Sequence, residues 1–170
     1  MKGLPMSAVA VYSGTFDPIT NGHADIAIRA ANIFDKVIVA IADFPGASKK
    51  PIFTGEERLQ LAKTALAEKN NIEVVTFSSL LIDFVKESKA NVIIRGIRSF
   101  TDFDYEAQLS GMNNHLDPDI ETVYMNCTPE LGYISSTLVK EVAFLGRNVS
   151  DLLHPVVATA LAQRIAEIKK

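Results

Sequence analysis

This chain of 170 residues has few cysteines and histidines and no excess of positive charge, and each of these absences excludes a class of function. A single cysteine, Cys127, excludes an intramolecular disulfide and is typical of a reducing compartment. Lys and Arg number 17 against 20 Asp and Glu, so the net charge of −3 gives no global attraction to nucleic acid, and any anion site must be local. The histidines, His23, His115 and His154, are too scattered to form a zinc signature.

Long apolar runs and targeting signals are also missing from the sequence. No apolar stretch approaches the length of a membrane span. Residues 1–7 are too short and too weakly charged for a signal peptide, and we expect them to form a flexible N-terminal extension. We therefore expect a cytoplasmic protein that binds neither membrane nor nucleic acid. With 48% hydrophobic residues, we expect residues 1–170 to form a single domain that buries roughly 70% of its unfolded surface.

Short β-branched apolar runs alternate with helical patterns along the chain. Helices are predicted by a stripe through Ile26, Ala30, Ile33 and Phe34, and by a capping box that begins at Thr54. Further helices are predicted at Phe100–Asn114, at Ser135–Leu145 and after Pro155. The predicted strands are Val9–Tyr12, Val37–Ala42, Ile72–Val75, Val92–Ile94 and Thr122–Met125. This alternation predicts an α/β, Rossmann-like, doubly wound parallel sheet.

The stretch from Tyr12 to His23 joins the first predicted strand to the helix that follows. It therefore lies at the carboxyl edge of the sheet, where open α/β sheets bind ligands. Gly14 and Gly22 would allow close backbone approaches. His23 is expected in the first helical turn, whose free N–H groups and dipole attract anions. The alternative interpretation is a polar loop in which the histidine only caps the helix.

Cationic residues follow the second and fourth predicted strands. Lys49 and Lys50 lie in a polar loop, where adjacent lysines are ordinarily solvated surface. Arg95 ends a buried strand and places a fixed cation, with donors suited to bidentate phosphate contact, at the ligand edge. Structural ion pairs are the alternative, either of Arg95 with an aspartate or of Arg98 with a glutamate.

Hydroxyl and leucine side chains begin two other predicted helices. Ser135, Ser136 and Thr137 stand at a helix start, where such residues ordinarily act as caps. Leu80 and Leu81 follow the third strand and, on pattern alone, are more typical of a core than of a ligand wall.

These segments together resemble a known family. The run from Gly14 to His23, in its T-x-G-H form at 20–23, resembles the nucleotidyltransferase superfamily of adenylyl- and cytidylyltransferases. The run Ile134-Ser135-Ser136-Thr137 is similar to the second signature of that superfamily. Together with the Lys-Lys-Pro run at 49–51, Arg95-Gly96-Ile97-Arg98 and the run from Asp102 to Glu106, the chain resembles bacterial phosphopantetheine adenylyltransferases over nearly its whole length.

The resemblance implies an activity and a set of site residues. It implies transfer of the adenylyl group of ATP to 4′-phosphopantetheine, giving dephospho-coenzyme A and pyrophosphate in coenzyme A biosynthesis. It implies catalytic roles for His23, Lys49 and Arg95, and acceptor binding by Thr15, Lys49, Leu81 and Arg95. The implied ATP-binding residues are Thr15, Phe16, His23, Gly96, Ile97, Arg98, Glu106, Leu131, Gly132, Tyr133, Ile134, Ser135, Ser136 and Thr137. Mg²⁺ entering with ATP, a homohexamer and feedback inhibition by coenzyme A are implied in the same way.

The chain departs from the pattern of that family at three positions. Thr20 stands where the superfamily often has histidine, Ser79 where the family often has aspartate, and Lys140 where many relatives have arginine. The effect of Ser79 on the pantetheine arm stays open, and Lys140 is assigned no role. Two other functions also stay open, namely a nicotinate or nicotinamide mononucleotide adenylyltransferase and a protein that senses ATP without turnover.

Overall fold

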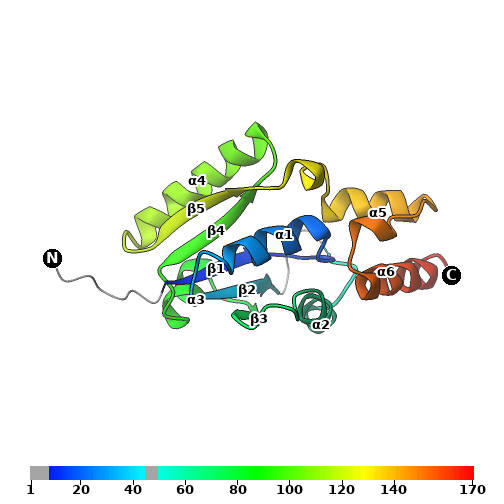
Figure 1. Ribbon diagram of the computed structural model, residues 1–170, viewed down its shortest axis with the longest axis horizontal. Helices are drawn as coiled ribbons and strands as arrows, with labels where there is room; N and C mark the ends of the chain where they lie inside the picture. The colour runs from blue at the N-terminus through cyan, green and yellow to red at the C-terminus, as the bar shows by residue number, and fades with distance from the viewer. Residues whose placement is uncertain (1–7, 45–49) are drawn as a thin grey trace.

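Five parallel strands form one sheet in the order β3-β2-β1-β4-β5. The computed structural model describes residues 8–44 and 50–170, and Figure 1 shows the arrangement of its elements. The strands are β1 (Val9–Gly14), β2 (Lys36–Ala42), β3 (Ile72–Phe77), β4 (Val92–Ile97) and β5 (Glu121–Asn126). The helices are α1 (Asn21–Ala30), α2 (Gly55–Ala65), α3 (Leu81–Glu87), α4 (Phe100–Leu116), α5 (Ser136–Phe144) and α6 (Pro155–Ile168), with single turns η1 (Pro129–Leu131) and η2 (Ser150–Leu152). The predicted doubly wound parallel sheet is confirmed.

The two faces of the sheet bury different sets of helices. On one face, Ala10, Val37 and Ile94 belong to a large core to which α1, α2, α5 and α6 contribute. On the other face, Val11 lies in register with Ile38 and with Ile93, and α3 covers this smaller core. Burial on both faces is the reason that these strands are apolar at consecutive positions rather than at alternate ones.

Local sequence signals set most helix starts. Thr54 and Glu57 form the predicted capping box, with Glu57 N–H donating to Thr54 Oγ1 at 3.2 Å and Thr54 N–H donating to Glu57 Oε2 at 2.8 Å. The stripe predicted after His23 is wrong at its end. Helix α1 stops at Ala30, and the side chain of Ile33 is 67% exposed in the turn that follows.

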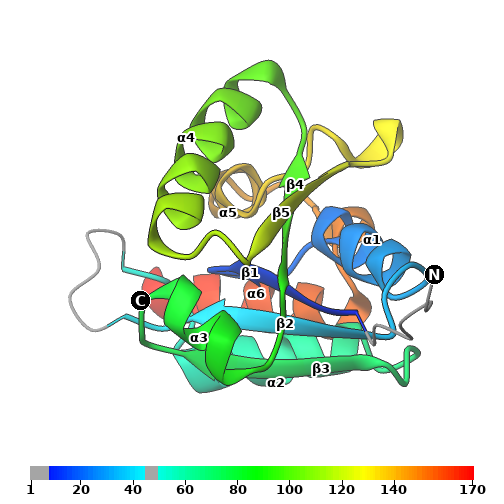
Figure 2. The same ribbon diagram turned by 90° about the vertical axis from the view of Figure 1, so that its left-hand side faces the viewer.

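Helix α4 stands apart from the cores. Figures 1 and 2 both show it beside β4 and β5, and none of its 17 residues is buried. Its exposed apolar side chains are Phe100, Phe103, Tyr105, Leu109, Met112 and Leu116. Among the described residues, no helix has the length and apolar character needed to cross a bilayer.

Candidate functional site

A cavity of about 490 Å³ opens at the carboxyl ends of β1, β2 and β4. The chain runs from β1 outward to β2 and β3 and then crosses back to β4 on the other side, so the cavity lies where the strand order reverses. This switch point is the usual ligand site of an open parallel sheet. The predicted site residues that line it are Thr15, Phe16, His23, Gly96, Arg98, Ile134, Ser135, Ser136 and Thr137.

Other predicted residues do not line this cavity. Ile97 and Gly132 line an adjoining hollow of about 570 Å³, which shares Arg98 and Cys127 with the cavity. Leu81 begins α3 and packs beside the smaller core. The remaining residues absent from the lining are Arg95, Glu106, Leu131 and Tyr133. Lys49, like the predicted extension at residues 1–7, lies outside the described residues.

His23 is fixed by a capping box at the start of α1. The backbone N–H of Thr20 donates to His23 Nδ1 at 3.1 Å, and the N–H of His23 donates to Thr20 Oγ1 at 3.4 Å. Because a backbone N–H can only donate, Nδ1 must be the acceptor, so the neutral ring carries its proton on Nε2. Burial, and secondarily the charge of Arg98, lowers the pKa of His23 from 6.5 to about 4. His23 is therefore a neutral N–H donor at neutral pH, and it both caps α1 and lines the cavity.

The ring of Phe16 packs between the rings of His23 and Tyr12. Phe16 packs edge-on against His23 with 5.1 Å between ring centroids and against Tyr12 with 5.4 Å. Phe16 has a φ of 48°, a left-handed conformation that is uncommon for a bulky side chain. A Cβ added to Gly14 would meet the Phe16 ring at 3.0 Å, so the predicted close approach at Gly14 is confirmed. The turn is thus held in one shape by ring packing.

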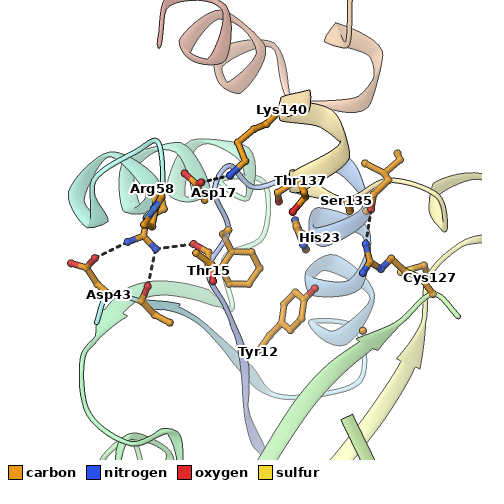
Figure 3. A pocket seen from close by; sticks show the side chains of 18 of the residues that line it. Tyr12, Thr15, Asp17, His23, Asp43, Arg58, Cys127, Ser135, Thr137 and Lys140 are labelled. Atoms are coloured by element: carbon orange, nitrogen blue, oxygen red, sulfur yellow. Dashed lines mark hydrogen bonds and ion pairs between the residues drawn. The ribbon is translucent and has the colours of Figure 1, made fainter. Parts of the chain in front are cut away.

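The amino end of α5 closes the opposite side of the cavity. Ser135 is its N-cap and accepts from Leu138 N–H at 3.1 Å, so its capping role is confirmed. Ser136 Oγ donates to the carbonyl of Pro18 at 2.8 Å, which joins this helix start to the β1–α1 turn. Figure 3 shows Ser135, Thr137 and His23 around the same space. Free N–H groups and the helix dipole make this end of the cavity suitable for phosphate.

Arg58 lines the cavity although the sequence did not single it out. It comes from α2, and its side chain is 1% exposed. Its guanidinium donates to the carbonyls of Thr15 and Ala42, both at 2.8 Å, and pairs with Asp43 at 2.6 Å (Figure 3). Arg58 therefore connects the ends of β1 and β2 to α2. An arginine on a capped helix carries no local signal of such a role.

Asp17 and Lys140 form a second unpredicted connection. Asp17 is 4% exposed and pairs with Lys140 of α5, 123 residues later in the chain (Figure 3). The same carboxylate accepts from the backbone N–H groups of Ile52 and Phe53 at 3.1 and 3.0 Å. Three separate segments are thereby fixed by one buried charge. Lys140, which the sequence left without a role, lines the cavity beside it.

Arg95 and Arg98 both make structural ion pairs. Arg95 pairs with a glutamate and Arg98 with an aspartate, the reverse of the partners expected from the sequence. Arg95 binds Glu106 through two contacts of 2.5 and 2.6 Å and also donates to Ser13 Oγ at 3.1 Å. Arg98 pairs with Asp102 at 3.0 Å and lines the cavity. Arg95 thus lies at the edge of the site with its guanidinium already engaged, whereas Arg98 faces the cavity directly.

Cys127 lies between the cavity and the adjoining hollow. It is half-buried and unpaired, and burial raises the pKa of its thiol. A raised pKa disfavours the thiolate, the form in which a cysteine acts as a nucleophile.

Two comparisons with known proteins agree with this fold. A family model described as "Cytidylyltransferase-like" matches residues 11–142. The crystal structure of the lipopolysaccharide core biosynthesis protein from Thermoplasma volcanium GSS1 is 23% identical, with a TM-score of 0.53, over 71% of this chain and 96% of that one. At this level of identity the likeness concerns the fold.

Proposed function

Since this chain belongs to the cytidylyltransferase-like family, a family of nucleotidyltransferases, we propose that it transfers the adenylyl group of ATP to 4′-phosphopantetheine. The products would be dephospho-coenzyme A and pyrophosphate, as in coenzyme A biosynthesis. The choice of ATP and of this acceptor rests on the resemblance of the runs at 14–23, 49–51, 95–106 and 134–137 to phosphopantetheine adenylyltransferases.

One observation carries the proposal: two turns far apart in the sequence meet at one cavity. His23 lines it as a neutral donor at one side, and the start of α5 lines it at the other. An imidazole N–H suits the α-phosphate of a nucleotide, where negative charge increases during attack. A helix start suits the β- and γ-phosphates that leave.

The reaction needs positioning more than acid–base chemistry. A phosphate oxygen of the acceptor attacks the α-phosphorus, and the bond from that phosphorus to the bridging oxygen breaks to release pyrophosphate. Near neutral pH the attacking phosphate is already largely deprotonated, so no general base is required. Ser13, Arg58 and the Asp17–Lys140 pair keep the surrounding turns in place while the charge moves.

The acceptor phosphate is proposed to bind between Lys49 and Arg95. Arg95 Nη1 donates to two neutral oxygens of Ser13, and a phosphate oxygen would form a stronger bond with it because both partners would then be charged. Thr15 would assist at the cavity wall, and Leu81 would contact the neutral pantetheine arm farther out. Each of these assignments follows the resemblance.

The nucleoside is proposed to extend from the cavity toward the adjoining hollow. Ile97, Phe100, Phe103 and Pro129 give that hollow a mainly apolar lining, which suits a base. The further ATP contacts proposed are those of Phe16, Gly96, Glu106 and residues 131–137.

Mg²⁺ is proposed to arrive bound to the phosphates of ATP. Within residues 8–44 and 50–170, no group of three or more metal-binding side chains gathers in one place. The carboxylates on the cavity wall, Asp17 and Asp43, are already paired with Lys140 and Arg58. The metal would neutralise phosphate charge, and the protein residues would orient the complex.

Self-association and inhibition by coenzyme A complete the proposal. A homohexamer follows from the resemblance, and the unburied helix α4, where Phe100 is 92% exposed, provides apolar surface for contacts between copies. Coenzyme A would compete because it shares the pantetheine arm. A cytoplasmic location is proposed on the single cysteine.

Pyrophosphate release from a panel of substrates tests the proposed function. ATP and CTP would each be offered with 4′-phosphopantetheine and with nicotinate mononucleotide. We expect release with ATP and 4′-phosphopantetheine at least a hundredfold faster than with any other pair. Preference for nicotinate mononucleotide would assign the sister activity, and tight ATP binding without release would assign a sensor.

A further inference from the structure

Charged side chains from three parts of the chain, the β1–α1 turn, α2 and α6, hold Ile52 and Phe53, which follow Lys50 and Pro51. Asp17 accepts the N–H groups of Ile52 and Phe53 at 3.1 and 3.0 Å. Arg58 Nε donates to the Phe53 carbonyl at 3.2 Å, and Arg164 Nη1 donates to the Ile52 carbonyl at 3.1 Å. All four main-chain polar groups of these two residues are therefore bound by ionised partners, which form stronger hydrogen bonds than neutral ones.

Of Asp17, Arg58 and Arg164, only Arg164 lies outside the part of the chain that matches the family model. It lies on α6, beyond residues 11–142, and does not line the cavity. Its guanidinium carbon is 5.2 Å from the centre of the Phe53 ring, and it pairs with Glu57 and, at 3.3 Å, with Glu167. A planar cation over an aromatic face, paired with Glu57, has little freedom to leave Ile52.

We infer that Arg164 is a positioning residue for the acceptor side of the cavity. Together with Asp17 and Arg58, it fixes Ile52 and Phe53, and therefore the place at which Lys50, two residues before Ile52, lines the cavity. Lys50 adjoins in the sequence Lys49, to which the proposed function assigns the acceptor phosphate. This inference rests on the proposed function, because it assigns the lysine-bearing side of the cavity to the acceptor phosphate. The ATP phosphates are assigned to His23 and to the start of α5, and within the described residues no hydrogen bond or ion pair joins either of them to Arg164. Loss of Arg164 should therefore weaken acceptor use and spare ATP use.

The test compares Arg164→Met with a matched control, Glu167→Gln. Methionine keeps an unbranched apolar stem against Phe53 but removes every donor. The control removes one partner of Arg164 on the side away from the loop, where Glu167 is 66% exposed. Steady-state kinetics with each substrate varied in turn give separate KM values for 4′-phosphopantetheine and ATP. Hydrogen exchange of the Ile52 and Phe53 amides reports the anchor without any substrate.

We expect Arg164→Met to raise the KM for 4′-phosphopantetheine about tenfold and to change the KM for ATP less than twofold. Hydrogen exchange at Ile52 and Phe53 should become at least tenfold faster. Glu167→Gln should stay near wild type in both KM values and in the exchange rate. Equal rises in both KM values, or faster exchange with an unchanged acceptor KM, would reduce Arg164 to a structural role and overturn the inference. Unchanged exchange would overturn the anchor itself. If the wild type transfers nothing to 4′-phosphopantetheine, the proposed function fails and the inference falls with it, while hydrogen exchange still shows whether the anchor exists.

Discussion

Replacement of His23 by glutamine separates the two roles that the structure assigns to this residue. His23 caps α1 through Nδ1, which accepts from the N–H of Thr20, and it lines the cavity as an Nε2–H donor. Glutamine is a usual residue at this position of a capping box, where its side-chain oxygen accepts the same N–H. His23→Gln therefore keeps the cap but displaces the donor, because its amide N–H groups lie where the imidazole Nε2–H does not, and a small misplacement of a catalytic group is costly. His23→Ala removes both the cap and the donor.

The expected magnitudes follow from these contacts. Loss of one donor to the reacting phosphate costs about 10²–10³ in kcat, or roughly 3–4 kcal/mol. Loss of a capping interaction costs about 0.5–2 kcal/mol of unfolding free energy. Both variants should therefore lose activity to a similar extent. Only His23→Ala should lose stability.

Pyrophosphate-release kinetics at saturating substrates and urea unfolding of the same three proteins provide the measurement. Wild type and His23→Gln should unfold at nearly the same urea concentration, whereas kcat should be lower by two to three orders of magnitude in the variant. A His23→Gln protein with kcat within fivefold of wild type would refute the catalytic role. Loss of activity in His23→Ala alone would mean that the residue acts only through the helix.

Other predictions concern the buried arginine, pH and the acceptor. Arg58→Met leaves three carbonyls without their donor and should lower the unfolding free energy by roughly 3–5 kcal/mol in urea titrations. Because the pKa of His23 is about 4 folded and 6.5 unfolded, the unfolded chain binds this proton first as the pH falls. The wild type should therefore lose stability relative to His23→Gln between pH 6.5 and 4, as measured by urea unfolding across that range. Arg95→Gln should lower kcat/KM for the acceptor tenfold or more and leave the ATP dissociation constant, measured by calorimetry, nearly unchanged.

The sequence was sufficient to predict the elements and the first turn of the site. Each predicted strand was found in place, because short runs rich in β-branched residues favour a strand. The capping box at Thr54 is likewise a local pattern with a local outcome. The turn that ends at His23 was predicted to lie at the ligand edge, and it lines the cavity, because its position depends on the strand and helix that directly flank it.

The connections that hold the site could not be predicted in the same way. Asp17 meets Lys140 only after α5 packs on the β1–α1 turn, and the sequence around neither residue indicates the pairing. Arg58 resembles a surface residue of a capped helix until the ends of β1 and β2 enclose it. Arg95 was predicted as a fixed cation at the ligand edge, with pairing to an aspartate as the alternative, and its actual pairing with Glu106 depends on how α4 lies against β4. Long-range charge pairs are set by tertiary packing, not by spacing.

Isotope transfer from the acceptor tests the central claim, attack of a phosphate on the α-phosphorus of ATP, most directly. 4′-Phosphopantetheine with ¹⁸O in its three non-bridging phosphate oxygens would be incubated with ATP and the wild-type protein, and the products weighed by mass spectrometry. The account predicts dephospho-coenzyme A that retains all three labelled oxygens, together with an equal amount of unlabelled pyrophosphate. Release of AMP or ADP in place of pyrophosphate, or label in the pyrophosphate, would contradict it.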